Sequence, residues 1–413
     1  MIHLELTGNE KAEGRSDRLV KVFKDAEKAV EELTAESIGE EEARHGQQPE
    51  DQAVSFRRPQ IFALTALHEL PPPQGLFYRK DGRPFLRLWM KNACNVELIV
   101  NQQKMIFLEV DRNVWELTLG MEPGFYYVTL SVDGVEVLSP FLPIGYGYSR
   151  PCNYLEIGPS EAFYSAGRAP HGDIRHEYFY SEVTGKNETC LVYTPPGYEK
   201  GTESYPVLYL QHGFGENETS WVWQGRIGNI MDNLLYEKKA VPMLIVMADG
   251  MMREGEGQEE KLCHQRFPVF LTESILPFIE TKYRVRPGRE NRGIAGLSMG
   301  SMQTSMTAFM HEELFAWIGL FSGFLRNYIG VEQVDASHLA GLFADPAAFN
   351  AKNRLLFRAI GKEDVFFHFF MEEDQLCEDY QVRQVRRIFE GGHDWNVWRK
   401  CAWEFLQLIF KEE

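Results

Sequence analysis

The sequence predicts an α/β protein whose main domain follows a small all-β domain and an N-terminal helical extension. Beyond about residue 171, short apolar runs alternate with helical stretches, which is typical of a mostly parallel sheet covered on both faces. Before that point the runs are shorter and are separated by turn residues. The first 52 residues are rich in Glu, Lys and Ala and almost lack aromatics. A length of 413 residues agrees with two or three domains.

Charge and hydropathy exclude several partners. Acidic residues outnumber basic ones by 60 to 43, and the formal charge of -17 repels nucleic acid and anionic lipid. No apolar run reaches the roughly 18 residues that span a bilayer. The first ten residues have neither a basic region nor an apolar core, so no signal peptide is recognised. We expect a cytoplasmic protein without a nucleic-acid or membrane partner, unless a leader has been removed.

The N-terminal extension, residues 1–52, contains one helical pattern. A helix is predicted from 17 to 37, because apolar residues recur there at steps of three and four: Leu19, Val22, Phe23, Ala26, Val30 and Leu33. The stretch 39–51 has no such period and is predicted to be a solvated linker. The apolar stripe either packs on its own chain or forms a homo-oligomer contact, and the pattern does not choose between them. The β-sandwich that follows is the other candidate for a homo-oligomer contact.

Residues 53–160 predict a β-sandwich. Six short runs have strand character: 85–89, 96–100, 105–110, 114–119, 124–132 and 135–138. Turns are expected at 111–113 and at Asp133-Gly134. Aromatic residues on these runs either pack in the core or offer a sugar-stacking surface. The stretch 145–151 is interpreted as an ordered connector.

The region 171–413 predicts the α/β domain. Its strand candidates are 207–211, 243–247, 293–297, 317–321, 355–360 and 385–389. Its helix candidates are 227–238, 269–282, 300–310, 371–377 and 398–410.

The sharpest chemical signal is Gly296-Leu297-Ser298-Met299-Gly300. This G-x-S-x-G directly follows an apolar strand candidate and precedes a helix candidate. A serine on such a turn is strained and exposed, and the flanking glycines leave room for the turn and the helix. The context predicts that Ser298 is a nucleophile.

A serine hydroxyl needs a base and an orienting carboxylate. His393 follows the last strand candidate, on a loop that two glycines open. Asp364 follows the strand candidate 355–360 and is the preferred carboxylate, with Glu363 the near rival. Asp345 is weaker because it ends no clear strand. The alternative role for Asp364 is to cap the following helix.

Acyl transfer also needs donors for the developing oxyanion. The strand candidate 207–211 leads into His212-Gly213-Phe214-Gly215, an H-G-x-G loop. The backbone amides of Phe214 and Met299 are therefore the expected oxyanion hole. His212 precedes the donor loop, and we interpret it as structural.

These blocks resemble a known family. Residues 192–198, 205–213, 295–300 and 391–395 are similar to the feruloyl esterases of carbohydrate esterase family one and to their siderophore-trilactone esterase relatives, which share the α/β-hydrolase fold. The resemblance implies that Ser298 is the nucleophile, His393 the base and Asp364 its partner. The preceding region contains Val114-Trp115 and Glu122-Pro123-Gly124-Phe125-Tyr126-Tyr127. Through these residues it resembles, more weakly, the immunoglobulin-like, early-set sandwich of carbohydrate-binding module family forty-eight.

The resemblance also implies a reaction. It predicts two-step hydrolysis of hydroxycinnamoyl esters, such as a small phenolic ester or a feruloylated oligosaccharide, with no metal or organic cofactor. Three side chains near the predicted loops either contact a planar phenolic acid or pack in the core: Trp221, Gln303 and Trp395. Acetyl-xylan, siderophore-lactone or general carboxylesters are alternative substrates for the same triad. An inactive glycan-binding scaffold is the alternative from another class.

Overall fold

The computed structural model describes residues 73–255, 260–323, 325, 342 and 344–411, which form two compact units. The first unit contains residues 73–122 and 129–143, and the second contains residues 123–128 and 144–411. The predicted helix at 17–37 and its linker at 39–51 lie outside the described residues. Within the described part of the chain, no helix has the length and apolarity needed to cross a bilayer.

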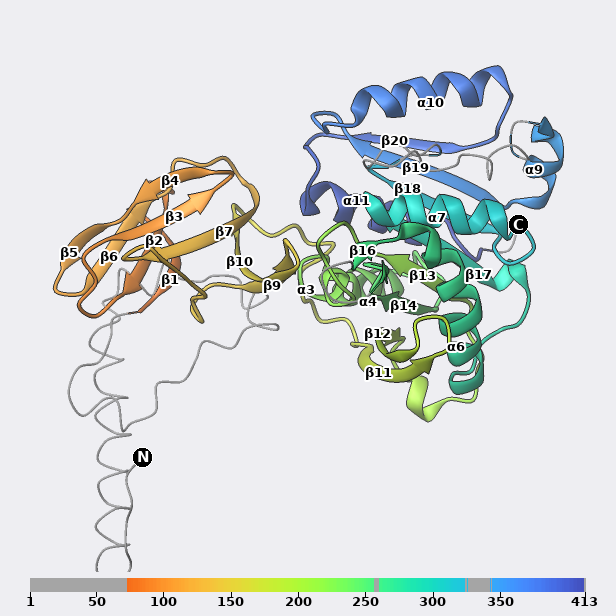
Figure 1. The fold of residues 1–413 in the computed structure, drawn as a ribbon, viewed down its shortest axis with the longest axis horizontal. Coiled ribbons are helices and arrows are strands. Elements are labelled where there is room, and N and C mark those ends of the chain that lie inside the picture. Colours follow the sequence, from red (N-terminus) through yellow and green to blue (C-terminus); the bar gives the residue numbers. More distant parts are fainter. Residues whose placement is uncertain (1–72, 256–259, 324, 326–341, 343, 412–413) are drawn as a thin grey trace, which may run out of the picture. The chain divides into compact units, whose positions relative to one another are not determined.

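The first unit is all-β (Figure 1). One antiparallel sheet has the order β1-β2-β6-β5. In the same unit β3 pairs with β4 and with the second half of β7, and β7 also pairs with β8. The strands are β1 Gly75–Tyr78, β2 Pro84–Trp89, β3 Val96–Val100, β4 Gln103–Ile106, β5 Leu108–Asp111, β6 Val114–Thr118, β7 Gly124–Val132 and β8 Val135–Val137. The first half of β7, residues 124–128, belongs to the second unit, where it pairs with β10 Arg150–Ile157.

One predicted strand of this unit is wrong in its extent. The run 105–110 is divided between β4 and β5 at Phe107, which is buried and whose amide donates to Val96 O. The buried Phe107 ring lies where the chain crosses from the sheet that contains β4 to the sheet that contains β5. A pattern of alternating apolar and polar residues does not show where such a crossing occurs. The predicted turns are confirmed, since Asn113, Asp133 and Gly134 all have positive φ.

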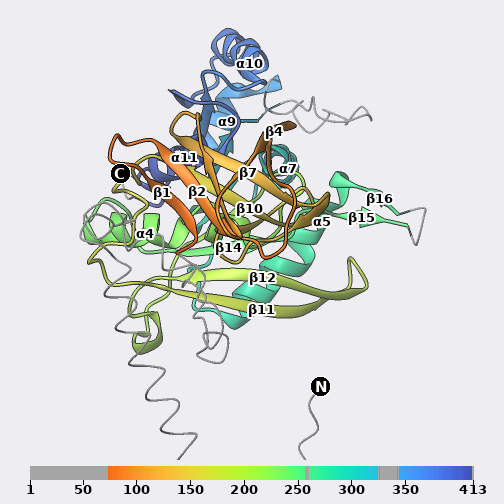
Figure 2. The same cartoon turned by 90° about the vertical axis from the view of Figure 1, so that its left-hand side faces the viewer.

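The second unit is built on an eight-stranded sheet with the order β11-β12-β14-β13-β17-β18-β19-β20. The first two strands run antiparallel to their neighbours, and all pairings from β14 onward are parallel. Figure 2 shows β11 and β12 side by side. The strands are β11 Asp173–Ser181, β12 Lys186–Thr194, β13 Val207–Gln211, β14 Leu244–Ala248, β17 Arg292–Leu297, β18 Trp317–Phe321, β19 Leu355–Gly361 and β20 Val385–Phe389.

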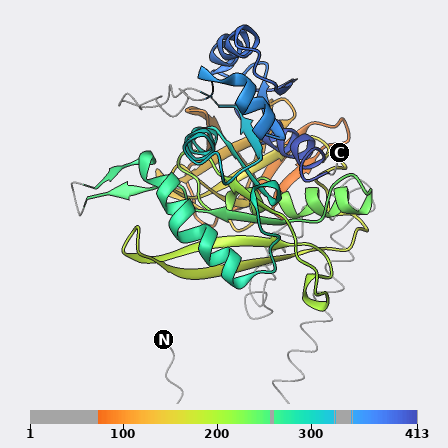
Figure 3. The ribbon, with the colours of Figure 1, turned by 90° about the vertical axis from the view of Figure 1, so that its right-hand side faces the viewer.

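Helices cover both faces of this sheet, as the sequence predicts. Side chains from α5, α6 and α7 join one apolar cluster with alternate residues of the central strands. Figure 3 shows the ribbon of the α5–α6 segment, in green-teal, crossing the strands of the sheet. Side chains from α4 and α11 join the other cluster with the remaining alternate residues. The helices are α3 Ser220–Trp223, α4 Ile227–Tyr236, α5 Phe267–Phe270, α6 Leu276–Lys282, α7 Met299–Met310, α9 Pro346–Lys352, α10 Phe367–Asp379 and α11 Trp395–Leu406.

Shorter elements complete the unit. A π-helical turn joins α5 to α6, and a two-stranded ribbon precedes α5. These elements are η2 Tyr198–Lys200, β15 Arg253–Glu254, β16 Lys261–Leu262, η4 His264–Arg266, η5 Leu271–Ile275 and η6 Arg289–Asn291. Each lies outside the central sheet and connects its strands and helices.

A hairpin before the large sheet also belongs to the second unit. The predicted connector 145–151 is instead part of two antiparallel strands, β9 Ile144–Gly147 and β10 Arg150–Ile157. Glu156, at the end of β10, forms ion pairs with Arg226 and Arg399. The Arg399 side chain is fully buried, and those of Glu156 and Arg226 are nearly so. This cluster ties β10 to the start of α4 and to α11.

We expect Glu156→Ala to destabilise the protein strongly. Without this carboxylate, two buried guanidinium groups lose their counter-charge, which costs about 3–5 kcal/mol. The measurement is the free energy of unfolding in urea. Glu161→Ala is the matched control, because Glu161 pairs with Lys400 at 3.3 Å on the surface and its loss costs about 0–1 kcal/mol. Equal effects of the two substitutions would contradict a structural role for the buried cluster.

Candidate active site

Ser298 occupies a sharp turn between β17 and α7. Its backbone has φ 51° and ψ -116°, a conformation that is strained for any residue except glycine. A Cβ on Gly296 would lie 2.4 Å from Gly300 O, and a Cβ on Gly300 would lie 2.4 Å from His212 O. Both glycines of the motif are therefore required by close backbone approach, as the sequence predicts.

His393 lies between Ser298 and Asp364. Its Nε2 is 2.9 Å from Ser298 Oγ, and its Nδ1 is 2.9 Å from Asp364 Oδ2. The imidazole also has edge-to-face contacts with Phe366 and Trp398, whose ring centroids are 5.1 Å and 5.0 Å away. These contacts fix the ring plane, and the carboxylate selects the tautomer with the proton on Nδ1.

Three carboxylates that the sequence left in competition have separate partners. Asp364 is buried, receives the His393 hydrogen bond and also accepts one from Phe366 N at 2.9 Å. Glu363 accepts from Gly391 N at 2.6 Å and so holds the loop that carries the histidine. Asp345 caps α9 by accepting from the amide of Ala348.

The predicted donor loop lies against the serine. A Cβ on Gly213 would be 3.7 Å from Ser298 Cβ. Within the loop, Gly213 N donates to Glu216 Oε2, Gly215 N lies 3.3 Å from Met251 Sδ, and Glu216 N donates to Gly213 O. Among the described residues Phe214 N has no hydrogen-bond acceptor. Met299 N is the first amide of α7, and such amides have no acceptor within the helix.

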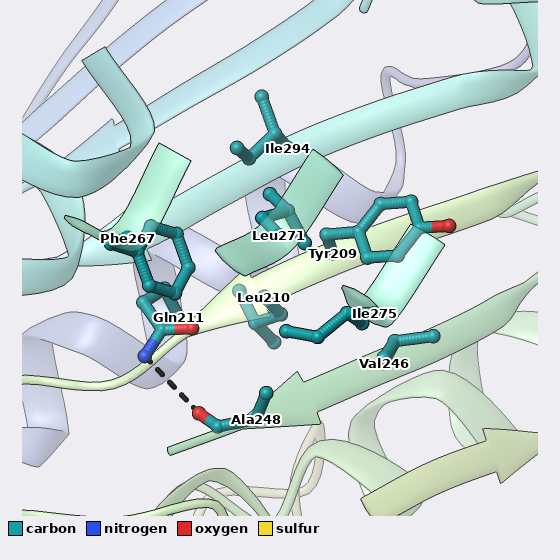
Figure 4. Close-up of a pocket in the computed structure, with 9 residues that line it drawn as sticks. All are labelled: Tyr209, Leu210, Gln211, Val246, Ala248, Phe267, Leu271, Ile275 and Ile294. Carbon is teal, nitrogen blue, oxygen red and sulfur yellow. Dashed lines mark hydrogen bonds between the residues drawn. The ribbon is translucent and has the colours of Figure 1, made fainter. Parts of the chain in front are cut away.

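His212 has a structural role, as the sequence indicates. The buried ring accepts from Gly250 N at its Nε2, 2.8 Å away, and its Nδ1 donates to Gly213 O at 2.8 Å. It therefore joins the loop after β13 to the loop after β14. Gln211 Nε2 adds a second link by donating to Ala248 O at 3.1 Å (Figure 4).

The small cavity in that view lies between β13, β14 and the α5–η5 segment and is lined mainly by apolar side chains.

Glu216 is a buried carboxylate that the sequence analysis does not single out. It accepts from Gly213 N at 3.0 Å, from Tyr127 Oη at 2.8 Å and from Trp395 Nε1 at 3.0 Å. Burial raises the pKa of Glu216. The three donors come from the donor loop, from the start of β7 and from the helix after His393. One side chain thus fixes several segments of the site.

The three residues expected to contact a planar acyl group are corrected by the structure. Trp221 is 1% exposed and Trp395 is 0% exposed, and their rings pack edge to face at 5.1 Å. Gln303 is also 0% exposed, and its Nε2 donates to Gly250 O at 2.7 Å. No face of either indole is open to a substrate, so the core-packing alternative holds for these side chains.

The fold and the hydrogen-bonded series Ser298, His393 and Asp364 are those of an α/β-hydrolase. Residues 181–401 match the family model described as "Putative esterase". The chain belongs to this esterase family.

Three known proteins are similar to this chain. An endo-1,4-beta-xylanase/feruloyl esterase of Xylanibacter ruminicola is 34% identical over 320 residues, which cover 74% of this chain and 41% of that protein. The chain thus spans about two fifths of that relative. A ferulic acid esterase of Anaeromyces mucronatus, solved with ferulic acid, is 23% identical with a TM-score of 0.52 and covers 61% of this chain and 96% of its own. The enterobactin esterase of Shigella flexneri is 13% identical with a TM-score of 0.58, and the match covers 81% of this chain and 96% of that protein. The two structural likenesses support the fold.

We expect Asp364→Asn to lower kcat by about a thousandfold or more, because an amide favours the wrong imidazole tautomer. Glu363→Gln is the matched control, since its carbonyl oxygen can still accept from Gly391 N, and we expect a loss within about tenfold. The measurement is steady-state hydrolysis of an ester by both variants. A larger loss in Glu363→Gln than in Asp364→Asn would contradict the assignment of Asp364.

Proposed function

We propose that the protein is a serine esterase that cleaves hydroxycinnamoyl esters through an acyl-enzyme. The observation that carries the proposal is the pair of 2.9 Å contacts that joins Ser298 Oγ, His393 and Asp364. A serine, a base and a buried carboxylate in this order can generate an alkoxide equivalent at neutral pH. The amide of Phe214, which has no acceptor among the described residues, and the first amide of α7 support an oxyanion hole formed by Phe214 and Met299.

Hydrolysis then proceeds in two steps. His393 Nε2 takes the proton of Ser298 as Oγ attacks the ester carbonyl, and the amides of Phe214 and Met299 stabilise the oxyanion. Collapse of the tetrahedral intermediate breaks the bond to the alcohol oxygen, and His393 returns the proton to that oxygen. Water, deprotonated by His393, attacks the acyl-serine in the same way. The acid is released, and Ser298 regains its proton.

The acyl group is chosen on the similarity to a relative with feruloyl esterase in its name, at 34% identity. The substrate that we propose is a hydroxycinnamoyl ester of a plant cell-wall sugar, such as a feruloylated oligosaccharide, or a related small phenolic ester. Acetyl esters, lactones and other simple esters would use the same serine chemistry and differ in the pocket that holds the acyl group.

We further propose that the all-β part of the chain, predicted for residues 53–160, is an immunoglobulin-like sandwich of the early-set type. Support comes from its two sets of antiparallel strands and from inward-facing apolar side chains on alternate positions. Such domains carry glycan-binding surfaces in some proteins and serve as structural modules in others.

The test of the proposed function is release of ferulate from methyl ferulate, followed by chromatography. We expect Ser298→Ala to reduce the rate on the order of a millionfold, since the nucleophile is removed. Ser301→Ala is the matched control one turn along α7, because Ser301 Oγ is buried and has no hydrogen-bond partner among the described residues. It should retain wild-type activity.

Two outcomes would overturn parts of the proposal. Cleavage of vinyl acetate without release of ferulate by the wild type would retain the serine esterase and reject the hydroxycinnamoyl substrate. Equal ferulate release by Ser298→Ala and wild type would reject the serine mechanism.

A further inference from the structure

The tip of the β9–β10 hairpin is held against the donor loop of the active site. Gly147 pairs with Arg150, so Tyr148 and Ser149 form a two-residue turn. Both have positive φ, 54° and 60°, as a type I′ turn requires. That turn favours Asn and Gly, and a tyrosine with positive φ is strained by about 1–2 kcal/mol. Backbone strain of this kind persists where the surroundings impose it, and it gathers at functional sites.

Several contacts impose the position of this turn. Ser149 N donates to Gly215 O at 2.7 Å, and a Cβ on Gly215 would lie 3.3 Å from both N and Cα of Tyr148. Behind the turn, Gln224 Nε2 donates to Tyr146 O at 2.8 Å, and Tyr146 Oη donates to Ser149 O at 3.1 Å. The hairpin tip and the donor loop therefore form one rigid surface.

The Tyr148 ring is held on one side and open on the other. The Tyr148 and Tyr127 rings meet edge to face, with the ring centroids 5.5 Å apart and the planes at 66°. Tyr127 is itself fixed, because its hydroxyl donates to Glu216 and accepts from Gln224. Tyr148 nevertheless remains 69% exposed. Exposure of the aromatic ring to water is unfavourable. Covering it with the face of another ring removes apolar surface from water and is therefore favourable.

The turn that carries Tyr148 packs on the donor loop, which also contacts Ser298. Gly213 approaches Ser298 and Gly215 approaches Tyr148, and these two glycines are separated only by Phe214. Their Cα atoms are at most about 7 Å apart. Phe214 carries the proposed oxyanion donor and is itself 60% exposed. Two exposed aromatic side chains, Phe214 and Tyr148, thus belong to the donor loop and to the turn that packs on it.

We propose that Tyr148, with Phe214 beside it, forms a subsite that stacks on a ring of the ester substrate. The ligand is a flat, largely apolar ring face, supplied either by the phenolic acyl group or by the sugar that carries it. This inference rests on the proposed function, because it assumes that an ester is cleaved at Ser298. The subsite would contain a binding residue, Tyr148, from a hairpin outside the eight-stranded sheet. The indoles of Trp221 and Trp395 are buried and offer no such surface.

The test replaces Tyr148 with Asn, which removes the ring and adopts positive φ readily, so the turn is retained. Tyr148→Phe keeps the ring and should behave as wild type. Tyr236→Asn is the matched control, since Tyr236 is 65% exposed on α4. Three esters separate the sources of the ring: methyl ferulate has it on the acyl side, monoacetylated xylose has it on the alcohol side, and vinyl acetate has none.

We expect Tyr148→Asn to lower kcat/KM for one ring-bearing ester about tenfold more than for vinyl acetate, mainly through KM. The ester that is affected identifies the side on which the ring stacks. Equal losses on all three esters, or no loss on any, would overturn the proposal. A wild type that cleaves acetates without cleaving methyl ferulate would reject the feruloyl substrate, and acetylated xylose would then decide the role of Tyr148.

A binding measurement separates this inference from turnover. In Ser298→Ala protein, calorimetry with methyl ferulate and with acetylated xylose should give about tenfold weaker binding of one of them after Tyr148→Asn. Unchanged Kd for both ligands would overturn the subsite even if the enzyme is active.

Discussion

The close crossing of β17, α7 and the end of β13 is the constraint on which the rest of the site depends. Gly296 and Gly300 allow backbone atoms to approach where any Cβ would collide, and this leaves Ser298 at a φ of 51°. The strained turn projects the serine beyond the sheet and directs the first amide of α7 to the same place. An alanine at either glycine would have to separate the strand from the helix, and the hydroxyl would lose its position relative to His393.

Loops from neighbouring parallel strands complete the arrangement, because the carboxyl ends of parallel strands meet at one edge of the sheet. The loops after β13, β17, β19 and β20 supply Phe214, Ser298, Asp364 and His393. Glu216 holds this arrangement by accepting hydrogen bonds from Gly213, Tyr127 and Trp395. A buried carboxylate with well-placed donors rigidifies such a network, whereas a poorly satisfied one would destabilise it.

Local patterns in the sequence were sufficient for the α/β architecture and for bringing Ser298, His393 and Asp364 together, because each residue lies at a strand end with a recognisable glycine or helix beside it. The same local patterns did not predict features that depend on which side chains are buried in the folded chain. Trp221 and Trp395 lie next to site loops in sequence, yet their rings point into the core. The 145–151 segment carries no strong strand pattern, and its hairpin forms on contacts with Gly215 and Gln224. The partners of Glu216 are distant in sequence, so no local signal marks it.

The central claim is that Ser298 is the nucleophile of an esterase, and covalent labelling tests it most directly. A fluorophosphonate reacts with a serine activated by histidine and forms a stable phosphonyl ester at the attacking oxygen. Peptide mass mapping should find the label on Ser298, and ferulate release should fall in proportion to the labelled fraction. Labelling of a different residue as activity is lost, or full ferulate release from protein labelled completely at Ser298, would contradict the account.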